Sequence, residues 1–175
     1  MISDLNLITA KPVIYLLNVN ESDVKHPSEK VKKVLDYCAS RKIPAVELCG
    51  SIEGELSDLD EEARREFLAD LGLAEGGLAR LVHAAYALLG LIIFFTKDGP
   101  EARAWTVVRG TKAPQAAGKI HSDFEKGFIR AEVYGFDDLN AAGSEQKLKE
   151  SGLVRIEGHD YVVKDGDVIH FRFNV

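Results

Sequence analysis

The feature that most constrains the fold is a strand, helix and strand pattern near the start of the chain. Residues 12–17 form a continuous apolar run with two β-branched members, which is typical of a strand buried on both faces of a parallel sheet. Apolar residues recur at helical spacing between 31 and 38 and predict a helix over residues 28–40. A second apolar run predicts a strand over residues 43–48, so the segment is expected to form a right-handed βαβ unit.

Polar segments follow both predicted strands. They are Asn18-Val-Asn-Glu21 after the first strand and Cys49-Gly-Ser51 after the second. A βαβ unit brings the carboxyl ends of its strands to one edge of the sheet, where ligands of open α/β sheets bind. We therefore expect the two segments to share one pocket.

The rest of the first 90 residues is predicted to be helical. One apolar stripe runs to Leu71 after a cap at Asp58 or Asp60, and another covers residues 78–89. Only two parallel strands are predicted in this region, and a sheet of two strands leaves its edges unpaired and its faces thinly covered. We therefore expect that part of this domain should precede residue 1 and is missing from the sequence.

The pattern changes from Leu91 to short strands and turns. Strands are predicted over residues 91–96, 104–108, 128–133 and 168–173, with a hairpin over 154–163 and helices near 114–123 and 144–150. A mixed sheet of about five strands crossed by one main helix indicates a β-grasp domain. The predicted fold class is therefore α/β plus α+β, with a partial α/β domain over residues 1–90 and a β-grasp domain over residues 91–175.

Charge and composition limit the partners. The 175-residue chain has a net charge of −6, which argues against a protein that coats nucleic acid, but residues 97–130 are basic between two acidic flanks. This basic island, interleaved with Trp105 and Phe128, suits phosphates or stacked bases, whereas a solvated charged face with both aromatic residues in the core is the alternative. The candidate nucleic-acid-binding residues are Arg103, Arg109, Lys112, Lys119, Lys126 and Arg130.

Several other classes of protein are not expected. The longest apolar stretch is too short for the ~20 residues of a membrane span, and the first residues lack the pattern of a secretory signal. Cys38 and Cys49 lie in apolar contexts and are expected to be buried free thiols in a cytosolic protein. The five histidines have no paired spacing that suits zinc, so no metal ligand is predicted, and His121 is expected to help hold the second domain together.

The segment Asn18-Val-Asn-Glu21 resembles the Asn-Lys-x-Asp motif with which translation-factor-class GTPases recognise guanine. The aspartate of that motif accepts hydrogen bonds from two N–H groups of guanine. Adenine has no 2-amino group, and its N1 is itself an acceptor. Glutamate in place of aspartate, together with the loss of lysine, therefore favours adenine. A solvated loop that caps a helix is the alternative for a motif this short.

The second half resembles one family specifically. Phe94-Phe-Thr, Arg103-Ala-Trp-Thr, the long block from Arg109 to Val133 and the segment from Asp165 to Asn174 are similar to the TGS domain of the YchF family, the Obg-like ATPases. The resemblance implies a P-loop protein with a GTPase-like domain, an inserted helical arm and a C-terminal β-grasp TGS domain. It also implies a preference for ATP and an association with ribosomes.

The chain lacks segments that the family uses to bind phosphates and magnesium. It contains no Gly-x-x-x-x-Gly-Lys-Ser/Thr motif, which cradles phosphates and holds magnesium, and the switch segments and helical arm are also absent. No catalytic residue is therefore predicted, and magnesium is expected only in the intact family protein. The sequence is similar to the C-terminal part of a family member.

The resemblance also implies roles for single residues. Asn18 is expected to offer its side-chain amide to the edge of adenine, the backbone of Val19 to meet the exocyclic amine, and Glu21 to help exclude guanine. The backbone N–H groups of Cys49, Gly50 and Ser51 are expected to close the other side of the base, although Cys49 also suits a small core residue.

Three hypotheses follow for the whole chain. The first is adenine-nucleotide recognition joined to ribosome association through the TGS domain, without hydrolysis by the chain alone. The second is an RNA or ribosome docking module that is independent of nucleotide. A ubiquitin-like carrier is the third, and it is disfavoured because the chain ends in Asn174-Val175 rather than in Gly-Gly. No DNA or membrane partner is expected.

Overall fold

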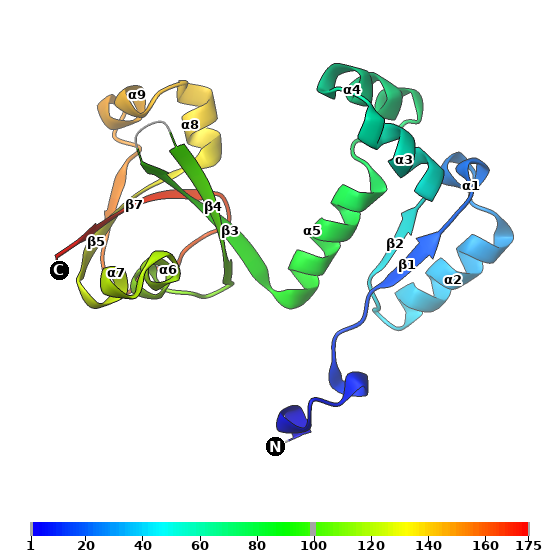
Figure 1. Cartoon of the computed structure of the whole chain (residues 1–175), viewed down its shortest axis with the longest axis horizontal. Coiled ribbons are helices and arrows are strands. Elements are labelled where there is room, and N and C mark those ends of the chain that lie inside the picture. The colour runs from blue at the N-terminus through cyan, green and yellow to red at the C-terminus, as the bar shows by residue number, and fades with distance from the viewer. Residues whose placement is uncertain (1, 99–100, 175) are drawn as a thin grey trace. The chain divides into compact units, whose positions relative to one another are not determined.

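The computed structural model describes residues 2–98 and 101–174 and divides into two compact units, Met1–Leu89 and Gly90–Val175 (Figure 1). The described elements of the first unit are, in chain order, η1 (Ile2–Leu5), η2 (Ile8–Ala10), β1 (Tyr15–Asn18), α1 (Glu21–Lys25), α2 (Glu29–Ser40), β2 (Ala45–Leu48), α3 (Gly50–Asp58), α4 (Glu61–Asp70) and α5 (Gly77–Leu89).

The βαβ unit predicted from the sequence is present. Strands β1 and β2 pair in parallel, with Tyr15 opposite Ala45 and Asn18 opposite Leu48, and helix α2 connects them. The prediction that the first strand is buried on both faces is wrong, because the Tyr15 and Leu16 side chains are exposed. In the part of the chain that the structure describes, β1 pairs with β2 alone, so its other edge has no neighbouring strand.

Helix ends in the first unit are fixed by carboxylates. Asp60, one of the two predicted caps, accepts a hydrogen bond from the Ala63 N–H at 2.9 Å and starts α4. The Glu53 carboxylate of α3 accepts hydrogen bonds from the N–H groups of Gly77 at 2.6 Å and Leu78 at 3.2 Å, which are the first donors of α5. Arg80 donates to the carbonyl of Glu47 at 2.9 Å and attaches α5 to β2.

The second unit contains a five-stranded sheet among its described residues. Its elements are β3 (Leu91–Asp98), β4 (Glu101–Val108), α6 (Ala113–Ile120), α7 (Ser122–Lys126), β5 (Phe128–Gly135), α8 (Phe136–Ala142), α9 (Glu145–Glu150), β6 (Arg155–Glu157) and β7 (Asp167–Phe173). The strand order is β4-β3-β7-β5-β6, with β3 and β7 parallel and the other neighbours antiparallel. The predicted fold class, α/β followed by a mixed sheet crossed by helices, is confirmed.

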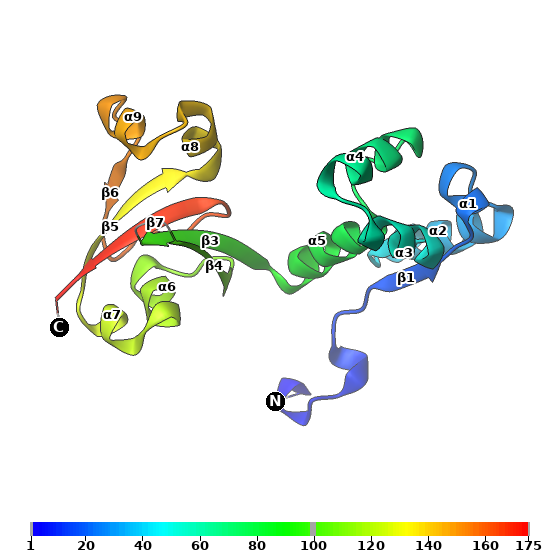
Figure 2. The same cartoon turned by 45° about the horizontal axis from the view of Figure 1, so that its top comes forward.

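Helices lie on both sides of this sheet, as Figure 2 shows: α6 and α7 on one side, α8 and α9 on the other. The larger core forms under α6, where its buried alanines pack against strand residues that include Phe94, Val133 and Ile169. A smaller core, with Tyr134 and Leu148, forms under α8 and α9. Alternate residues of β3 and β7 therefore face different helices.

The hairpin predicted over residues 154–163 is wrong. Only β6 (Arg155–Glu157) forms, and it pairs with β5. The following residues bind the start of α6 instead, because the Ala113 N–H donates to the Tyr161 carbonyl at 2.9 Å and the Val163 N–H donates to the Thr111 carbonyl at 3.0 Å. Residues 158–163 therefore form a turn that hydrogen-bonds to a distant segment. Their sequence alternates in the same way as a hairpin strand, which is why the prediction was wrong.

The structure confirms the expectations for the two cysteines and for the two aromatic residues of the basic island. Cys38 and Cys49 are free and buried. Phe128 is buried, and Trp105 is partly buried against the larger core. His121 caps α7, since its Nδ1 accepts a hydrogen bond from the Asp123 N–H at 3.2 Å. Among the described residues, no helix has the length and apolar character needed to cross a membrane.

Candidate functional site

The two segments that were predicted to share a pocket meet at the carboxyl edge of β1 and β2. The Val19 N–H donates to the Leu48 carbonyl at 2.8 Å, which extends the ladder one residue beyond β1. The chain then turns into helices on both sides: Asn20 precedes α1, and Cys49 precedes α3. Sequence reasoning placed loops here and missed both helices, because α1 is a single turn and α3 has a weak apolar stripe.

Side-chain contacts join the two segments. The Gly50 N–H donates to Asn18 Oδ1 at 3.4 Å, and the Ser51 hydroxyl donates to Glu21 Oε1 at 2.9 Å. The Ser51 hydroxyl also lies 3.2 Å from the sulfur of Cys49. Because the oxygen of the Asn18 amide accepts from Gly50, its NH₂ group points away from Gly50. Glu21 is held against the segment that follows β2 by its hydrogen bond with Ser51.

An open pocket of about 480 Å³ lies at this edge and is lined by residues 18–22 and 49–51. The Val19 and Cys49 side chains are buried in the core of this unit, beside Ile52 and Leu56, so these two residues can offer a ligand only their backbone groups. Cys49 is thus a core residue, the alternative that its sequence context suggested.

The pocket suits a neutral heterocycle better than a phosphate group. None of the residues that line it is lysine or arginine, and Glu21 is acidic. Its polar groups are amides, hydroxyls and the N–H groups at the starts of two helices, which match the donors and acceptors at the edge of a base. The lining alone cannot neutralise a triphosphate.

The six basic residues predicted to contact nucleic acid are all exposed, but they do not form one surface. Arg103 lies on β4 and pairs with Glu101 at 3.1 Å, while Lys112 pairs with Asp160 at 2.7 Å. Arg109 follows β4, Lys119 lies on α6 and Lys126 ends α7. Arg130 of β5 alternates with the core residue Ala131, so it points to the sheet face opposite α6.

On that opposite face Arg130 has basic neighbours that the sequence analysis missed. Arg172 of β7 lies directly opposite it in the sheet, and His170 is two residues away on the same face. Lys97 of β3 and Lys149 of α9 line a small cavity together with His170 and Arg172. The alternation of Val168, His170 and Arg172 with apolar residues in the sequence was the signal that these side chains share a face.

Two carboxylates partly balance these cations. The hydrogen bond from Arg172 Nε to Glu132 Oε1, 3.0 Å long, holds the pKa of Glu132 below its ordinary value. Lys97 lies 2.9 Å from Glu145 Oε1 and lowers the pKa of that carboxyl in the same way. Burial and the neighbouring Glu145 raise the pKa of the Tyr134 hydroxyl above its ordinary value.

Comparison with known proteins gives concordant matches. The family model YchF-GTPase_C, described as a protein of unknown function (DUF933), matches residues 91–174. The chain is 49% identical over 177 residues to the ribosome-binding ATPase YchF of Bacillus subtilis (strain 168), covering 100% of this chain and 48% of that protein. It is 42% identical over 171 residues to Obg-like ATPase 1 of Rattus norvegicus, covering 96% of this chain and 43% of that protein.

A solved structure is similar over both units. The YchF GTPase of Schizosaccharomyces pombe matches with a TM-score of 0.84 and 34% sequence identity, covering 98% of this chain and 46% of that chain. The chain spans about half the length of the curated relatives it matches.

Proposed function

Because the chain belongs to the YchF family, we propose that it supplies the adenine-recognition edge and the ribosome-binding surface of a YchF-type ATPase in the cytoplasm. The first unit corresponds to the base-recognition part of a G domain, and the second to a TGS domain. Hydrolysis of ATP requires groups that this chain does not contain, so the chain alone is not a catalyst.

The arrangement of Asn18, Val19 and Glu21 supports recognition of adenine. The Asn18 NH₂ group, oriented by the contact of its oxygen with the Gly50 N–H, donates to a ring nitrogen of the base. The Val19 N–H donates to the Leu48 carbonyl, so the carbonyl of Val19 is the group that accepts a hydrogen bond from the exocyclic amine. If the Glu21 carboxylate approached N1 of adenine, two acceptors would face each other. We therefore expect Glu21 to keep its hydrogen bond from the Ser51 hydroxyl when adenine binds.

The phosphates of ATP find no support in this pocket. Bound Mg²⁺ and phosphate would be held by the P-loop of an intact family protein, and this sequence has no such motif. We therefore expect a dissociation constant for ATP in the millimolar range or weaker, about 4 kcal/mol of binding free energy or less. Sub-micromolar binding or steady turnover by the pure chain would contradict the proposal.

Ligand-observed NMR with the pure chain tests the base contacts. Saturation transfer to the base protons of ATP is expected, with weaker transfer to those of GTP. Asn18→Ala is expected to abolish the ATP signal, because the side-chain amide proposed to bind the base is lost. Asn140→Ala, on an exposed position of α8 in the other unit, is the matched control and should leave the signal unchanged.

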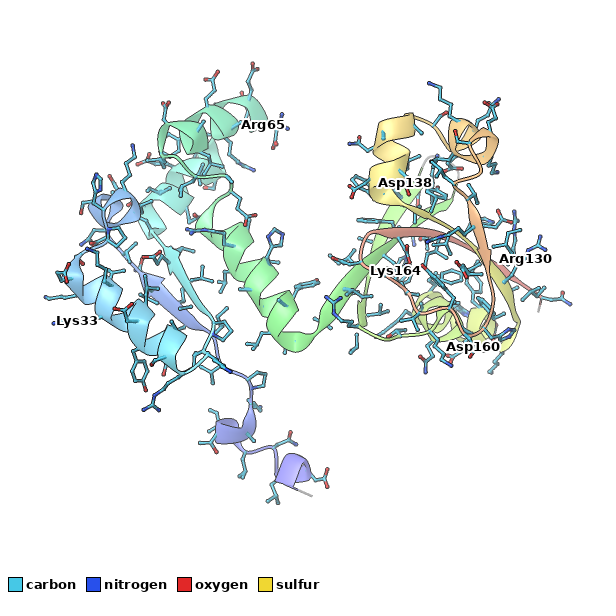
Figure 3. All side chains as sticks on the ribbon, turned by 180° about the vertical axis from the view of Figure 1, so that it is seen from behind. Lys33, Arg65, Arg130, Asp138, Asp160 and Lys164 are labelled. Atoms are coloured by element: carbon cyan, nitrogen blue, oxygen red, sulfur yellow. The ribbon has the colours of Figure 1, made fainter. Side chains whose placement is uncertain are left out.

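Ribosome association is tested by co-sedimentation over a salt series, with and without ATP. Lys119 and Arg130 are exposed cations without an ion pair among the described residues, so Lys119→Glu and Arg130→Glu are expected to weaken binding and to flatten its salt dependence. Lys112 is already paired with Asp160 and should matter less. Lys33→Glu, on α2 of the first unit, is the control; Figure 3 labels Lys33 and Arg130.

One observation favours a second candidate function, docking to RNA or ribosomes without nucleotide. The base pocket has no cation, whereas exposed cations are frequent on the second unit. Salt-sensitive co-sedimentation that ignores ATP, together with no NMR signal from any nucleotide, would select this candidate.

A further inference from the structure

A second pocket, of about 360 Å³, opens within the second unit where β3 and β7 diverge. The two parallel strands have a single registered pair, Phe95 with Val168, and separate beyond it. The separation gives access to the layer between the sheet and helices α6 and α7, from which Ile120 and Phe124 reach the pocket. None of the predicted adenine contacts lies here.

Aromatic rings form the walls of this pocket. Phe124 and Phe173 stack with ring centroids 3.7 Å apart and planes tilted by 23°, and Phe173 is 36% exposed. The indole of Trp105, on another wall, is held in place by a hydrogen bond of 2.9 Å from its Nε1 to Thr96 Oγ1. A planar group that enters can therefore lie against fixed π surfaces.

Cations line the mouth of the pocket and continue on the opposite face of the sheet. The pocket reaches that face through the gap between β3 and β7, where Lys97 and His170 line both the pocket and the cavity on the other side. Arg103 and Lys97 line the pocket, and Lys97 and His170 also line the adjoining cavity that contains Arg172 and Lys149. Arg130 extends the track, because it lies directly opposite Arg172. Like charges in directly opposed positions destabilise a sheet, and Glu132 compensates for only one of these two arginines.

We propose that the aromatic pocket receives an unstacked base of single-stranded RNA, while the adjoining phosphates lie along the cations at Lys97, Arg172 and Arg130. The inference rests on the proposed ribosome association and specifies its chemistry. Flat rings beside a row of cations match the alternation of base and phosphate in a single strand. A duplex keeps its bases stacked inside and cannot place one in the pocket, and a peptide has no regular row of anions.

Trp105 is the only tryptophan of the chain and lines the pocket, so its fluorescence reports occupancy directly. A single-stranded RNA of about eight nucleotides, within the usual site size of a stacking platform, is titrated into the full chain at low salt. Quenching or a spectral shift of Trp105 is expected, with binding measured in parallel by anisotropy of the labelled RNA. A duplex of the same length is the comparison and should bind without changing Trp105 emission.

Phe173→Leu tests the stack while keeping an apolar side chain in place. Loss of one aromatic platform is expected to weaken single-strand binding at least about fivefold. Phe136→Leu is the matched control, since Phe136 is a 49% exposed aromatic residue of the same unit that does not line the pocket. Arg172→Gln is expected to reduce the salt slope by about 1 without removing the Trp105 response. Arg103→Gln, at an exposed rim position, provides a second test if Phe173→Leu does not fold.

The outcomes separate this inference from the proposed function. Binding of ribosomes without any Trp105 response to single-stranded RNA would overturn the base pocket and leave ribosome association intact, with a protein contact as the explanation. Equal binding of single strand and duplex would also overturn it. A Trp105 response that Phe173→Leu removes supports the pocket even if ribosomes fail to co-sediment, in which case ribosome association alone is wrong.

Discussion

The two units solve the burial of a sheet differently. The first has a two-stranded sheet whose Tyr15 and Leu16 side chains remain exposed, whereas the second has five strands with Phe94 and Val133 fully buried. More strands give each face enough area to hold a helix layer, and in the second unit both faces have one. The comparison teaches that tight packing and the proposed base-recognition site lie in different parts of this chain, because the better-packed unit is not the one that contains the pocket at Asn18.

The largest expected effect comes from the core of the second unit. Phe94→Ala removes a ring that packs edge-on against Phe171, with centroids 6.0 Å apart, and is expected to cost about 3–5 kcal/mol of unfolding free energy. Leu16→Ala, at a 47% exposed position of β1, is the counterpart in the first unit and should cost about 1 kcal/mol or less. Urea unfolding followed by Trp105 fluorescence and by circular dichroism measures both. Equal losses of unfolding free energy for the two variants would show that the two units are packed equally well.

A smaller effect is expected where the first unit compensates for its thin sheet with helix caps. Glu53→Ala removes the acceptor for the Gly77 and Leu78 N–H groups and is expected to cost about 1 kcal/mol. Circular dichroism should show an earlier loss of helix while Trp105, in the second unit, reports an unchanged transition. Glu55→Ala, exposed on the same helix, is the control and should have no such effect.

The pH dependence of the second unit gives a third test. The pKa of Glu132 is lowered in the folded state by the hydrogen bond from Arg172, so its contribution is present above its ordinary pKa of 4.5 and is lost as the pH falls through the lower folded value. Glu132→Gln is therefore expected to cost on the order of 0.5 kcal/mol at neutral pH. The difference should vanish once the pH has fallen well below the folded pKa, because the carboxyl is then protonated in both states. A difference that persists in acid would assign the effect to packing.

The smallest effect is expected at the ion pair between Lys112 and Asp160, whose side chains are 51% and 94% exposed. Solvent screens such a pair, so Lys112→Ala should leave the urea midpoint unchanged within error. A measurable loss would show that the start of α6 depends on this contact.

Sequence reasoning found the elements with strong periodicity. The βαβ unit and the strands predicted over 91–96, 128–133 and 168–173 have apolar patterns that a single period describes. The structure confirms these strands as β3, β5 and β7. It failed where a helix has little more than one turn, as in α1. It also failed where residues in a turn hydrogen-bond to a segment far away in the sequence, as Tyr161 does with Ala113. The prediction that the first strand is buried was wrong, because an apolar run shows that a strand can be buried but not that other elements cover it.

The candidate sites show the same division. The meeting of Asn18 with Gly50 follows from βαβ topology, so it could be predicted. The grouping of Arg130 with Arg172 depends on strand order and register, which pair residues that are 42 positions apart in the sequence. The Phe124–Phe173 stack depends on the same long-range arrangement, and no local pattern indicates it.

Helix α3 connects the pocket at the carboxyl edge of β1 and β2 to the start of α5. Its first turn contributes Gly50 and Ser51 to the pocket, and Glu53, in the same turn, binds the amides of Gly77 and Leu78. A ligand that tightens the N-terminal turn of α3 also holds Glu53 more firmly on these two amides. Hydrogen exchange of the Gly77 and Leu78 amides with solvent would then slow when a ligand fills the pocket. The exchange rates of these two amides, which lie outside the pocket, would therefore report whether it is occupied.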